Sequence, residues 1–284
     1  MMALNGPTGI GMAALSGDPA YDVRVVGATD EVVSAVASGA VDIAAVPTNL
    51  ASVLYNKTQG GVKLIAVDTY GTLYILENGQ GVESIADLAG KKIHATGRGA
   101  NPQFILEYLL GQADLAVGED VQVEYLAEHA ELAALLAKGE AEIGLLPEPF
   151  VSVAQSKNPN VRVALDLNEL WEQATGGKLA MGCVVARTEW AADHPDQVAR
   201  FLDDLAASIA RANADVPGTA ALCAELGILP NVEVAEAAIP KCSLVCVTGT
   251  EAKVAVAGYL DVLAQANPKS VGGAVPDDAF YYEG

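Results

Sequence analysis

The chain has 284 residues, of which 51% are hydrophobic and 18% charged, and its formal net charge is −20 at pH 7. This length suits one large domain or two ordinary ones, and the charge-free stretch 43–56 is too short to span a membrane. So acidic a protein repels a phosphate backbone, which argues against a nucleic-acid partner. The excess charge is either a solubility coat or an attraction for a cation.

The first elements predict an alternation of strands and helices. Residues 1–4 read as the end of a strand, residues 5–11 as a glycine-rich turn that opens a helix, and residues 22–27 as a second strand. Residues 29–54 then predict an amphipathic helix stopped by Gly39, a short apolar strand, and a loop that begins at Pro47. The start at Met1 means either that the mature protein begins here or that a targeting segment has been removed.

Residues 129–154 repeat residues 29–54 without a gap. A weaker repeat surrounds this one, since residues 3–15 parallel 94–106 and the strand-like 22–27 parallels 121–126. A unit that occurs twice predicts two lobes of similar build, each with a sheet of parallel strands covered by helices. The positions that are identical in the two copies are Glu31 and Glu131, Ala37 and Ala137, Gly39 and Gly139, Ile43 and Ile143, Pro47 and Pro147, Ser52 and Ser152, and Val53 and Val153.

The segments outside the repeats predict the crossings between the lobes. Residues 63–78 contain two β-rich runs joined around Tyr70 and Gly71, and residues 178–188 are again strand-like. Residues 87–92 resemble a short helix that Gly90 stops before the next strand. We therefore expect lobe 1 to comprise residues 1–72 and 183–284, and lobe 2 to comprise residues 77–179.

The C-terminal third is predicted to be helical. A long helix begins near Pro195, and its apolar residues Val198, Phe201, Leu205 and Ile209 recur at helical spacing. Further helices are expected at 217–226, 232–238 and 251–266, and the aromatic tail is expected to pack on the surface.

Two glycine-rich turns are candidate ligand loops. Residues 5–11 and residues 96–102 each follow a strand and open a helix, with Asn101 predicted as the N-cap and Pro102 at the first helical position. Glycines let the backbone approach a ligand closely, and free N–H groups at a helix start suit an anionic or strongly polar group. Neither turn is a Walker motif or a full dinucleotide fingerprint, and the alternative is that both are tight turns without a ligand.

The proline-led loops offer polar side chains after equivalent strands. Thr48 and Asn49 follow Pro47. Glu148 follows Pro147, and Phe150 follows Pro149. Ligands of open α/β sheets lie outside the carboxyl ends of strands, where we expect these loops. Glu148 is predicted to pair with a cationic ligand group or with Arg98, or else to serve as an acid at a helix start.

Other residues at the strand ends carry weaker signals. Tyr70 lies at the first crossing, while Thr29 and His129 are equivalent positions that could equally be helix caps. His129 has no second metal ligand at a suitable spacing, so no metal site is expected. No nucleophile–base pair and no catalytic motif can be recognised from spacing.

The four cysteines show no metal-binding pattern. Cys183 lies in an apolar run and is expected to be a buried thiol. Cys223 could form a disulfide with Cys242 or Cys246, and the alternative is that all of them are unpaired thiols.

The stretches NGPTGIGM, VDIAAVPTNLASVLY, GVESIADLAGKKIHATGRGANP, GEAEIGLLPEPFVSVA and PKSVGGAVPDDAFYY together resemble the substrate-binding proteins of ABC importers. Within these, the chain is similar to the type 2 periplasmic-binding fold of the branch related to the proteins that bind alkanesulfonates, taurine and thiamine precursors. The resemblance spans essentially the whole chain and specifies the fold, but not the ligand.

The resemblance implies an α/β protein of two lobes, joined by two crossover strands, that closes by hinge bending on a small molecule in a cleft between them. It implies delivery of that molecule to a membrane permease, no cofactor, a monomer, and an extracytoplasmic location, often as a lipoprotein. In the loops that correspond to the family's ligand site, Arg98 is the one basic residue and Glu148 adds a negative charge. A sulfonate ligand is therefore doubtful. The expected ligand residues are Asn5, Gly6, Pro7, Thr8, Gly9, Thr48, Asn49, Tyr70, Gly97, Arg98, Gly99, Asn101, His129 and Glu148.

The competing function is catalysis. The same architecture also hosts enzymes of thiamine-pyrimidine and menaquinone biosynthesis, which need a reactive cysteine and histidine. Here Cys183 is the cysteine nearest a crossing and His129 has no evident partner, so the sequence favours a binding protein over an enzyme.

Overall fold

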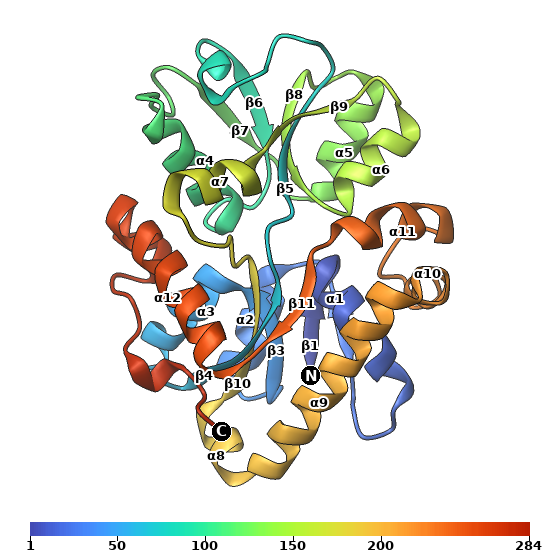
Figure 1. Ribbon diagram of the computed structural model, residues 1–284, viewed down its shortest axis with the longest axis vertical. Coiled ribbons are helices and arrows are strands. Elements are labelled where there is room, and N and C mark those ends of the chain that lie inside the picture. The colour runs from blue at the N-terminus through green and yellow to red at the C-terminus, as the bar shows by residue number, and fades with distance from the viewer. The chain divides into compact units, whose positions relative to one another are not determined.

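The computed structural model describes residues 1–284 and divides into two compact units (Figure 1). Unit 1 comprises Met1–Tyr70 and Ala180–Gly284, and unit 2 comprises Gly71–Leu179. None of the helices combines the length and the apolar character that crossing a bilayer requires.

Unit 1 contains a six-stranded sheet in the order β11-β4-β10-β3-β1-β2. Strands β1, β2 and β3 are parallel, whereas β10 is antiparallel to both of its neighbours and β11 is antiparallel to β4. The strands are β1 (Met2–Leu4), β2 (Arg24–Val26), β3 (Ile43–Pro47), β4 (Val62–Thr69), β10 (Gly182–Arg187) and β11 (Leu244–Val247).

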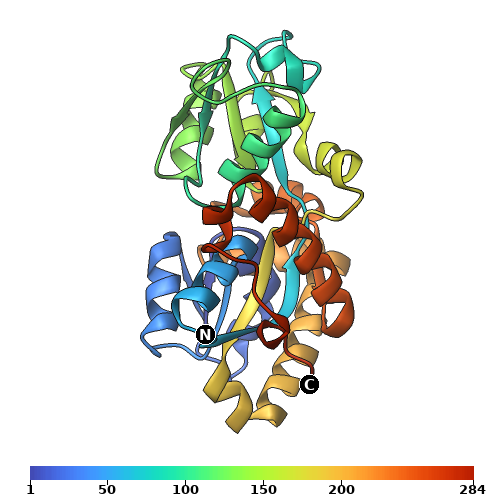
Figure 2. The same cartoon turned by 90° about the vertical axis from the view of Figure 1, so that its left-hand side faces the viewer.

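Helices cover both faces of this sheet. On one face, Phe201 and Leu205 of the long helix α9 pack with Ile10 of α1 and Val184 of β10 in a hydrophobic cluster. On the other face lie α3 and α12, which are side by side in Figure 2. The helices are α1 (Pro7–Met12), α2 (Thr29–Ala37), α3 (Thr48–Lys57), α8 (Thr188–Asp193), α9 (Pro195–Ala214), α10 (Val216–Glu225), α11 (Val232–Ala238) and α12 (Gly249–Ala266), with short 3-10 turns η1 (Ala13–Gly17), η3 (Ile239–Lys241), η4 (Pro268–Val271) and η5 (Asp278–Phe280).

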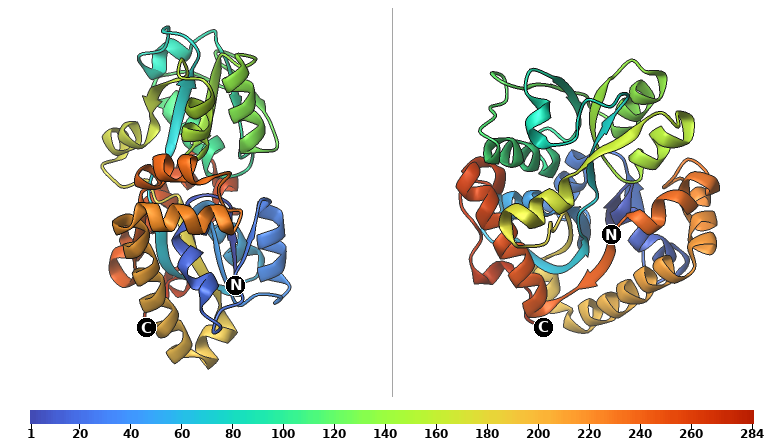
Figure 3. Two further views of the ribbon diagram at one scale, coloured as in Figure 1. Left: turned by 90° about the vertical axis from the view of Figure 1, so that its right-hand side faces the viewer. Right: turned by 45° about the horizontal axis from the view of Figure 1, so that its top comes forward.

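The helices predicted for the C-terminal third are confirmed. Helix α9 begins at Pro195 and buries Val198, Phe201, Leu205 and Ile209, the residues that recur at helical spacing. Helices α10 and α11 pack against each other beside α9 (Figure 3). These predictions succeeded because an apolar stripe of period 3.6 can be buried only when the segment is helical.

Unit 2 contains a five-stranded sheet in the order β7-β6-β8-β5-β9. Helix α4 packs beside α7, and α5 packs beside α6 (Figure 1). The elements are β5 (Leu73–Glu77), η2 (Ile85–Leu88), β6 (Lys92–Ala95), α4 (Asn101–Gln112), β7 (Gln122–Tyr125), α5 (His129–Lys138), β8 (Ile143–Pro147), α6 (Phe150–Lys157), β9 (Arg162–Asp166) and α7 (Leu167–Thr175).

The repeat in the sequence is a repeat in the structure. Helices α2 and α5 begin at Thr29 and His129, and strands β3 and β8 run from Ile43 to Pro47 and from Ile143 to Pro147. Gly39 and Gly139 follow the two helices, each with a backbone φ of 75°, a left-handed conformation that glycine adopts without a steric penalty. The prediction of two similarly built units is therefore confirmed at the level of single residues.

The prediction that the sheets are wholly parallel is wrong, because both are mixed. Strand β5 is antiparallel to β8, with Leu73 opposite Pro147, and β10 is antiparallel to β3, with Gly182 opposite Pro47. Each of these strands follows directly on a change of unit. The chain enters each sheet at the edge where the parallel strands end, so the entering strand must run the opposite way.

The sequence analysis did not predict β9, α7, α8 or β11, and helices α3 and α6 occupy the segments where it predicted only proline-led loops. The short strands β9 and β11 contain partly exposed residues, so neither produces a clear apolar run. The helix predicted within 87–92 is a 3-10 turn at Ile85–Leu88, held by a capping box between Ser84 and Asp87.

Candidate functional site

The predicted ligand residues of unit 1 lie along one edge of its sheet. Strands β1, β3 and β4 end at this edge, while β10 and β11 begin there. We call it the carboxyl edge of unit 1. Unit 2 has an equivalent carboxyl edge, where β6, β7, β8 and β9 end and β5 begins.

The glycine-rich turn of unit 1 is built by local packing. Gly6 has a φ of 112° and precedes α1, while a Cβ atom on Gly9 would lie 2.7 Å from the carbonyl oxygen of Leu4. The Thr8 hydroxyl donates to that same carbonyl at 3.0 Å. Asn5 is exposed, and Pro7 occupies the first helical position. Gly9 is thus required by the approach of the helix to β1, whereas Asn5 keeps its side chain in solvent.

Thr48 and Asn49 are both fully buried at the start of α3. The Asn49 amide donates to the carbonyl of Ser270 at 3.1 Å, and Ser52 and Asn56 on the same helix donate to the carbonyl of Val271. Asn49 therefore ties the C-terminal segment to α3, a structural role that the sequence analysis did not foresee. The Thr48 hydroxyl, in contrast, forms no hydrogen bond of normal geometry and lies near the Cys183 thiol.

The end of β4 contains two residues that the sequence analysis missed. Asp68 and Thr69 are 2% and 3% exposed, and neither oxygen of the Asp68 carboxyl nor the Thr69 hydroxyl forms a hydrogen bond of normal geometry, although the Thr69 side chain lies near the carboxyl and opposes the effect of burial on its pKa. Burial raises the pKa of the Asp68 carboxyl to about 7. The signal that could have identified Asp68 was an acid inside the otherwise apolar run that precedes Tyr70. The half-buried Tyr70 donates its backbone N–H to the carbonyl of Ser243.

The glycine-rich turn of unit 2 leads into α4. Gly97 has a φ of 73°, and a Cβ atom there would lie 2.8 Å from Cγ of Pro102. The Gly99 N–H donates to Oε1 of Gln103 at 2.8 Å. The prediction that Asn101 is the N-cap is wrong by one residue, since Ala100 holds that position and buried Asn101 begins the helix.

The exposed Arg98 extends from this turn over an aromatic ring. Its Cζ lies 6.0 Å from the ring centroid of Tyr125, a residue that the sequence analysis missed. The buried Tyr125 hydroxyl has no hydrogen-bond partner, and burial raises its pKa to about 12. No ion pair joins Arg98 to Glu148, so that alternative for Glu148 is wrong.

His129 is held by two neighbours from other segments. Its Nδ1 lies 2.5 Å from Oγ1 of the buried Thr96, and its ring centroid lies 5.0 Å from that of Phe150. Burial lowers the pKa of His129 to about 4, so the imidazole is neutral near pH 7. His129 and Thr29 each occupy the first position of a helix and neither caps it, which corrects the cap interpretation.

Glu148 is buried and stabilises the start of α6. One carboxylate oxygen accepts the Ser152 N–H and the other accepts the Ser152 hydroxyl, both at 3.0 Å. The interpretation of Glu148 as an acid at a helix start is therefore confirmed. A contact of Glu148 with a ligand remains a prediction.

None of the four cysteines forms a disulfide, so the disulfide alternatives are wrong. Cys183 is fully buried on β10, and burial raises its pKa far above the ordinary value, with the nearby Asp68 adding to the shift. A thiol so strongly held in its protonated form is a poor nucleophile.

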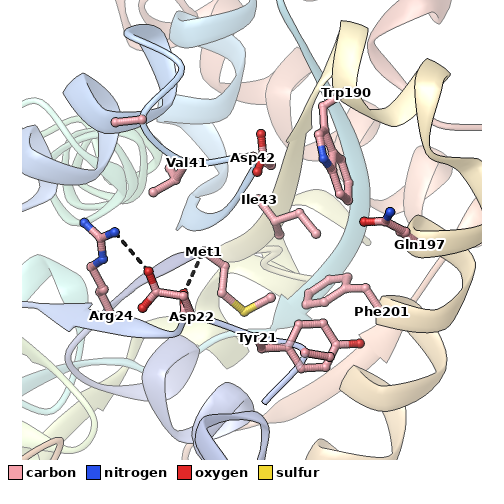
Figure 4. A pocket seen from close by; sticks show the side chains of 12 residues that line it. Met1, Tyr21, Asp22, Arg24, Val41, Asp42, Ile43, Trp190, Gln197 and Phe201 are labelled. Carbon is pink, nitrogen blue, oxygen red and sulfur yellow. Dashed lines mark hydrogen bonds and ion pairs between the residues drawn. The ribbon is translucent and has the colours of Figure 1, made fainter. Parts of the chain in front are cut away.

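A pocket of about 310 Å³ lies at the opposite edge of the unit 1 sheet (Figure 4). Tyr21, Trp190 and Phe201 line it, together with polar groups that have partners within the protein. Arg24 pairs with Asp22 at 3.0 Å, and the Met1 amine donates to the Asp22 carbonyl at 2.7 Å. The pocket contains none of the predicted ligand residues, and its charges are already compensated.

A protein-family model matches residues 12–235, and it describes the phosphonate-binding periplasmic substrate-binding proteins of ABC transporters. A comparison with curated proteins gives no match.

Solved structures are similar over nearly the whole chain. An ABC transporter protein from Parabacteroides distasonis is 29% identical with a TM-score of 0.83, over 99% of this chain and 97% of that one. The periplasmic aliphatic sulphonate-binding protein SsuA from Escherichia coli is 20% identical with a TM-score of 0.76, over 100% and 92% of the two chains. The ligand-binding component of an ABC-type import system from Staphylococcus aureus, solved with zinc bound, is 18% identical with a TM-score of 0.72, over 99% and 95%.

Proposed function

The chain belongs to the phosphonate-binding family of periplasmic substrate-binding proteins of ABC transporters, and we propose that it binds its ligand with both carboxyl edges and performs no chemistry on it. Such a protein works outside the cytoplasmic membrane and delivers a small molecule to an ABC permease. The two-lobed α/β fold is that of its structural neighbours.

The observation that carries the binding site is the equivalence of the two carboxyl edges. In each unit a glycine-rich turn follows one strand, and a proline-led turn follows the strand beside it, so backbone N–H groups and polar side chains gather at one edge. Ligands of open α/β sheets bind at this kind of edge. On the unit 1 edge we assign ligand contacts to Asn5, Gly6, Thr48 and Tyr70; on the unit 2 edge, to Gly97, Arg98, Gly99 and His129.

The state of the two most reactive side-chain types supports binding without catalysis. Cys183 is buried and remains a protonated thiol. His129 contacts the Thr96 hydroxyl and the Phe150 ring. The two residues therefore do not form the hydrogen-bonded pair of nucleophile and base that covalent catalysis requires. The remaining expected ligand residues support the loops: Gly9 allows close packing, and Asn49 and Glu148 hold neighbouring backbone.

A thermal-shift screen tests the proposed function. We would test phosphonates, sulfonates, amino acids, pyrimidines and metal ions, because a ligand that binds only the native state raises the melting temperature by mass action. The hit would be confirmed by calorimetry, and small-angle scattering would then compare the protein with and without it. A smaller radius of gyration is expected with ligand, because closure requires contacts made only in the closed state.

The Cys183→Ala variant separates binding from catalysis. It should bind the hit with unchanged affinity, and the wild-type protein should release the hit chemically unaltered. Turnover of the hit by the wild-type protein that disappears in Cys183→Ala would instead establish an enzyme.

A further inference from the structure

Three side chains at the carboxyl edge of unit 1 are buried without partners. Asp68, Thr69 and Thr48 are at most 3% exposed, and none of their side-chain oxygens forms a hydrogen bond of normal geometry, although Thr69 lies near the Asp68 carboxyl and Thr48 near the Cys183 thiol. Buried polar groups in native proteins are nearly always hydrogen-bonded, and an unpaired carboxylate is among the costliest exceptions. Three such groups at one edge therefore need an explanation.

The three residues flank the first residues of β10. Gly182 is opposite Pro47, which precedes Thr48, and it is also opposite Thr69 on the other side. The next residue, Cys183, is opposite Val67, so Asp68 is the extra residue of a β-bulge. Bulges often redirect a side chain next to a functional site.

Gly182 provides the space that this arrangement needs. A Cβ atom there would lie 2.5 Å from Oδ1 of Asp68 and 3.1 Å from Oγ1 of Thr69. Any larger residue would push the carboxyl and the hydroxyl out of their positions. The glycine, the bulge and the buried acid thus form one local unit.

The protein supplies nothing that would neutralise the Asp68 carboxyl. Asp68 takes part in no ion pair, and the titratable groups close enough to interact with it are the thiols of Cys183 on β10 and Cys246 on β11. Burial raises the pKa of both thiols, so they remain neutral. At and above about pH 7, where the Asp68 carboxyl ionises, its counter-charge must therefore come from outside the chain.

The chemistry of the three side chains defines that partner. A carboxylate offers only acceptors, and the two hydroxyls beside it can both act as acceptors. An anion would be repelled, and the protein contains no group of three or more His, Cys, Asp or Glu side chains that could hold a metal ion. A positively charged nitrogen with several N–H groups, as in an ammonium or an amidinium, matches all three.

We propose that Asp68, with Thr69 and Thr48, forms a subsite that binds the protonated nitrogen group of the transported ligand. This assignment rests on the proposed function, and it makes Asp68 the specificity-determining residue of unit 1. The ligand is accordingly a molecule with an ammonium or amidinium group, whatever group it presents to Arg98.

Matched pairs of compounds test this subsite by calorimetry and thermal shift. Each pair consists of a cationic compound and its uncharged-nitrogen or hydroxyl counterpart: aminoethylphosphonate with hydroxyethylphosphonate, taurine with isethionate, and benzamidine with benzamide. The wild-type protein should bind the cationic member of at least one pair about tenfold or more tightly than its counterpart, as expected for a charge-assisted hydrogen bond. Asp68→Asn should abolish this preference, and Thr69→Val should reduce it.

Asp30→Asn is the control, because Asp30 is an exposed acid at the start of α2 and its replacement removes the same charge elsewhere. It should leave the preference for the cationic compound intact.

Two results would overturn the proposed subsite while leaving the proposed function in place. One is binding of a nitrogen-free compound as tightly as its cationic counterpart, and the other is an unchanged preference in Asp68→Asn. If no member of any pair binds and the wider screen also gives no ligand, both proposals fail. If the wider screen yields a ligand that has no protonated nitrogen, the subsite alone fails. If Asp68→Asn does not fold, the test uses Thr69→Val, and an unchanged preference for the cationic compound in that variant overturns the subsite.

Discussion

Gly182 and Asp68 are in such close contact that a single methyl group on the glycine would overlap the carboxyl, with its Cβ 2.5 Å from Oδ1. The contact joins the first residue of β10 to the bulge residue of β4. It follows that the backbone of one crossing strand fixes the position of the one unpaired acid in the core of unit 1.

Replacement of Gly182 should therefore be costly. In Gly182→Ala, the new Cβ would also lie 3.0 Å from Cβ of Thr69, so the strand must shift. We expect a loss of about 1–3 kcal/mol in the free energy of unfolding, as is usual for overpacking, measured by urea denaturation. The matched control is Gly258→Ala in α12, where nothing lies within 4 Å and alanine should stabilise the helix by about 0.5–1 kcal/mol. If the two substitutions changed the free energy of unfolding equally, the close contact of Gly182 with Asp68 and Thr69 would be contradicted.

Asp68 should make stability depend on pH. Because the pKa of its carboxyl rises from 3.8 to about 7 on folding, the native state retains a proton that the unfolded state releases. Stability from this group is thus fully present below about pH 4 and is lost as the pH rises through 7, by on the order of 4 kcal/mol. Asp68→Asn removes this dependence, so its stability relative to the wild type should increase between about pH 5 and pH 8. Parallel curves of melting temperature against pH for the two proteins would show that Asp68 does not titrate in this way.

His129 should titrate in the opposite sense. Its pKa falls from 6.5 to about 4 on folding, so its contribution to stability is present above pH 6.5 and is lost as the pH falls toward 4. In NMR spectra the His129 ring protons, assigned with His129→Gln, should not shift between about pH 8 and pH 5. Thr96→Val removes the partner of Nδ1 and should cost about 1–2 kcal/mol. A midpoint near 6.5 for His129 would rule out its burial.

The cysteines should be unreactive in the native protein. Cys183, Cys223 and Cys242 are fully buried, and burial raises the pKa of the Cys223 thiol to about 11. Alkylation with iodoacetamide followed by mass spectrometry should label these three only after denaturation, while the partly exposed Cys246 reacts slowly beforehand. The control is denatured protein without reductant, which should show all four thiols. A mass two hydrogens lower would indicate a disulfide.

A buried ion pair should stabilise unit 2. Glu77 is 1% exposed and accepts hydrogen bonds from Gly81, Val82 and, at 2.5 Å, Arg162. Arg162→Met leaves this charge buried without its cation and should cost about 2–4 kcal/mol in urea denaturation. Arg200 pairs with Asp18 and Asp204 on the surface, so Arg200→Met should cost less than about 1 kcal/mol. If Arg162→Met and Arg200→Met lost the same free energy of unfolding, the burial of Glu77 would not make its ion pair more stabilising than a surface pair.

From the sequence alone we could predict the repeat, the helices and the loops at the strand ends. These depend on short-range signals: the spacing of Val198 and Phe201, the left-handed Gly39 and Gly139, and the prolines that end β3 and β8. Such signals act between residues that are neighbours in the chain, so they can be read without knowledge of the fold.

What the sequence could not show was how side chains from distant segments meet. Asn49 was predicted as a ligand residue from its place after Pro47, and only the fold shows that its amide donates to the carbonyl of Ser270, 221 residues further along the chain. Asp68 looked like one acid in a strand. Only the register of β4 against β10 leaves its carboxyl buried beside Gly182 without a partner, since strand register is decided by tertiary packing and not by the local sequence.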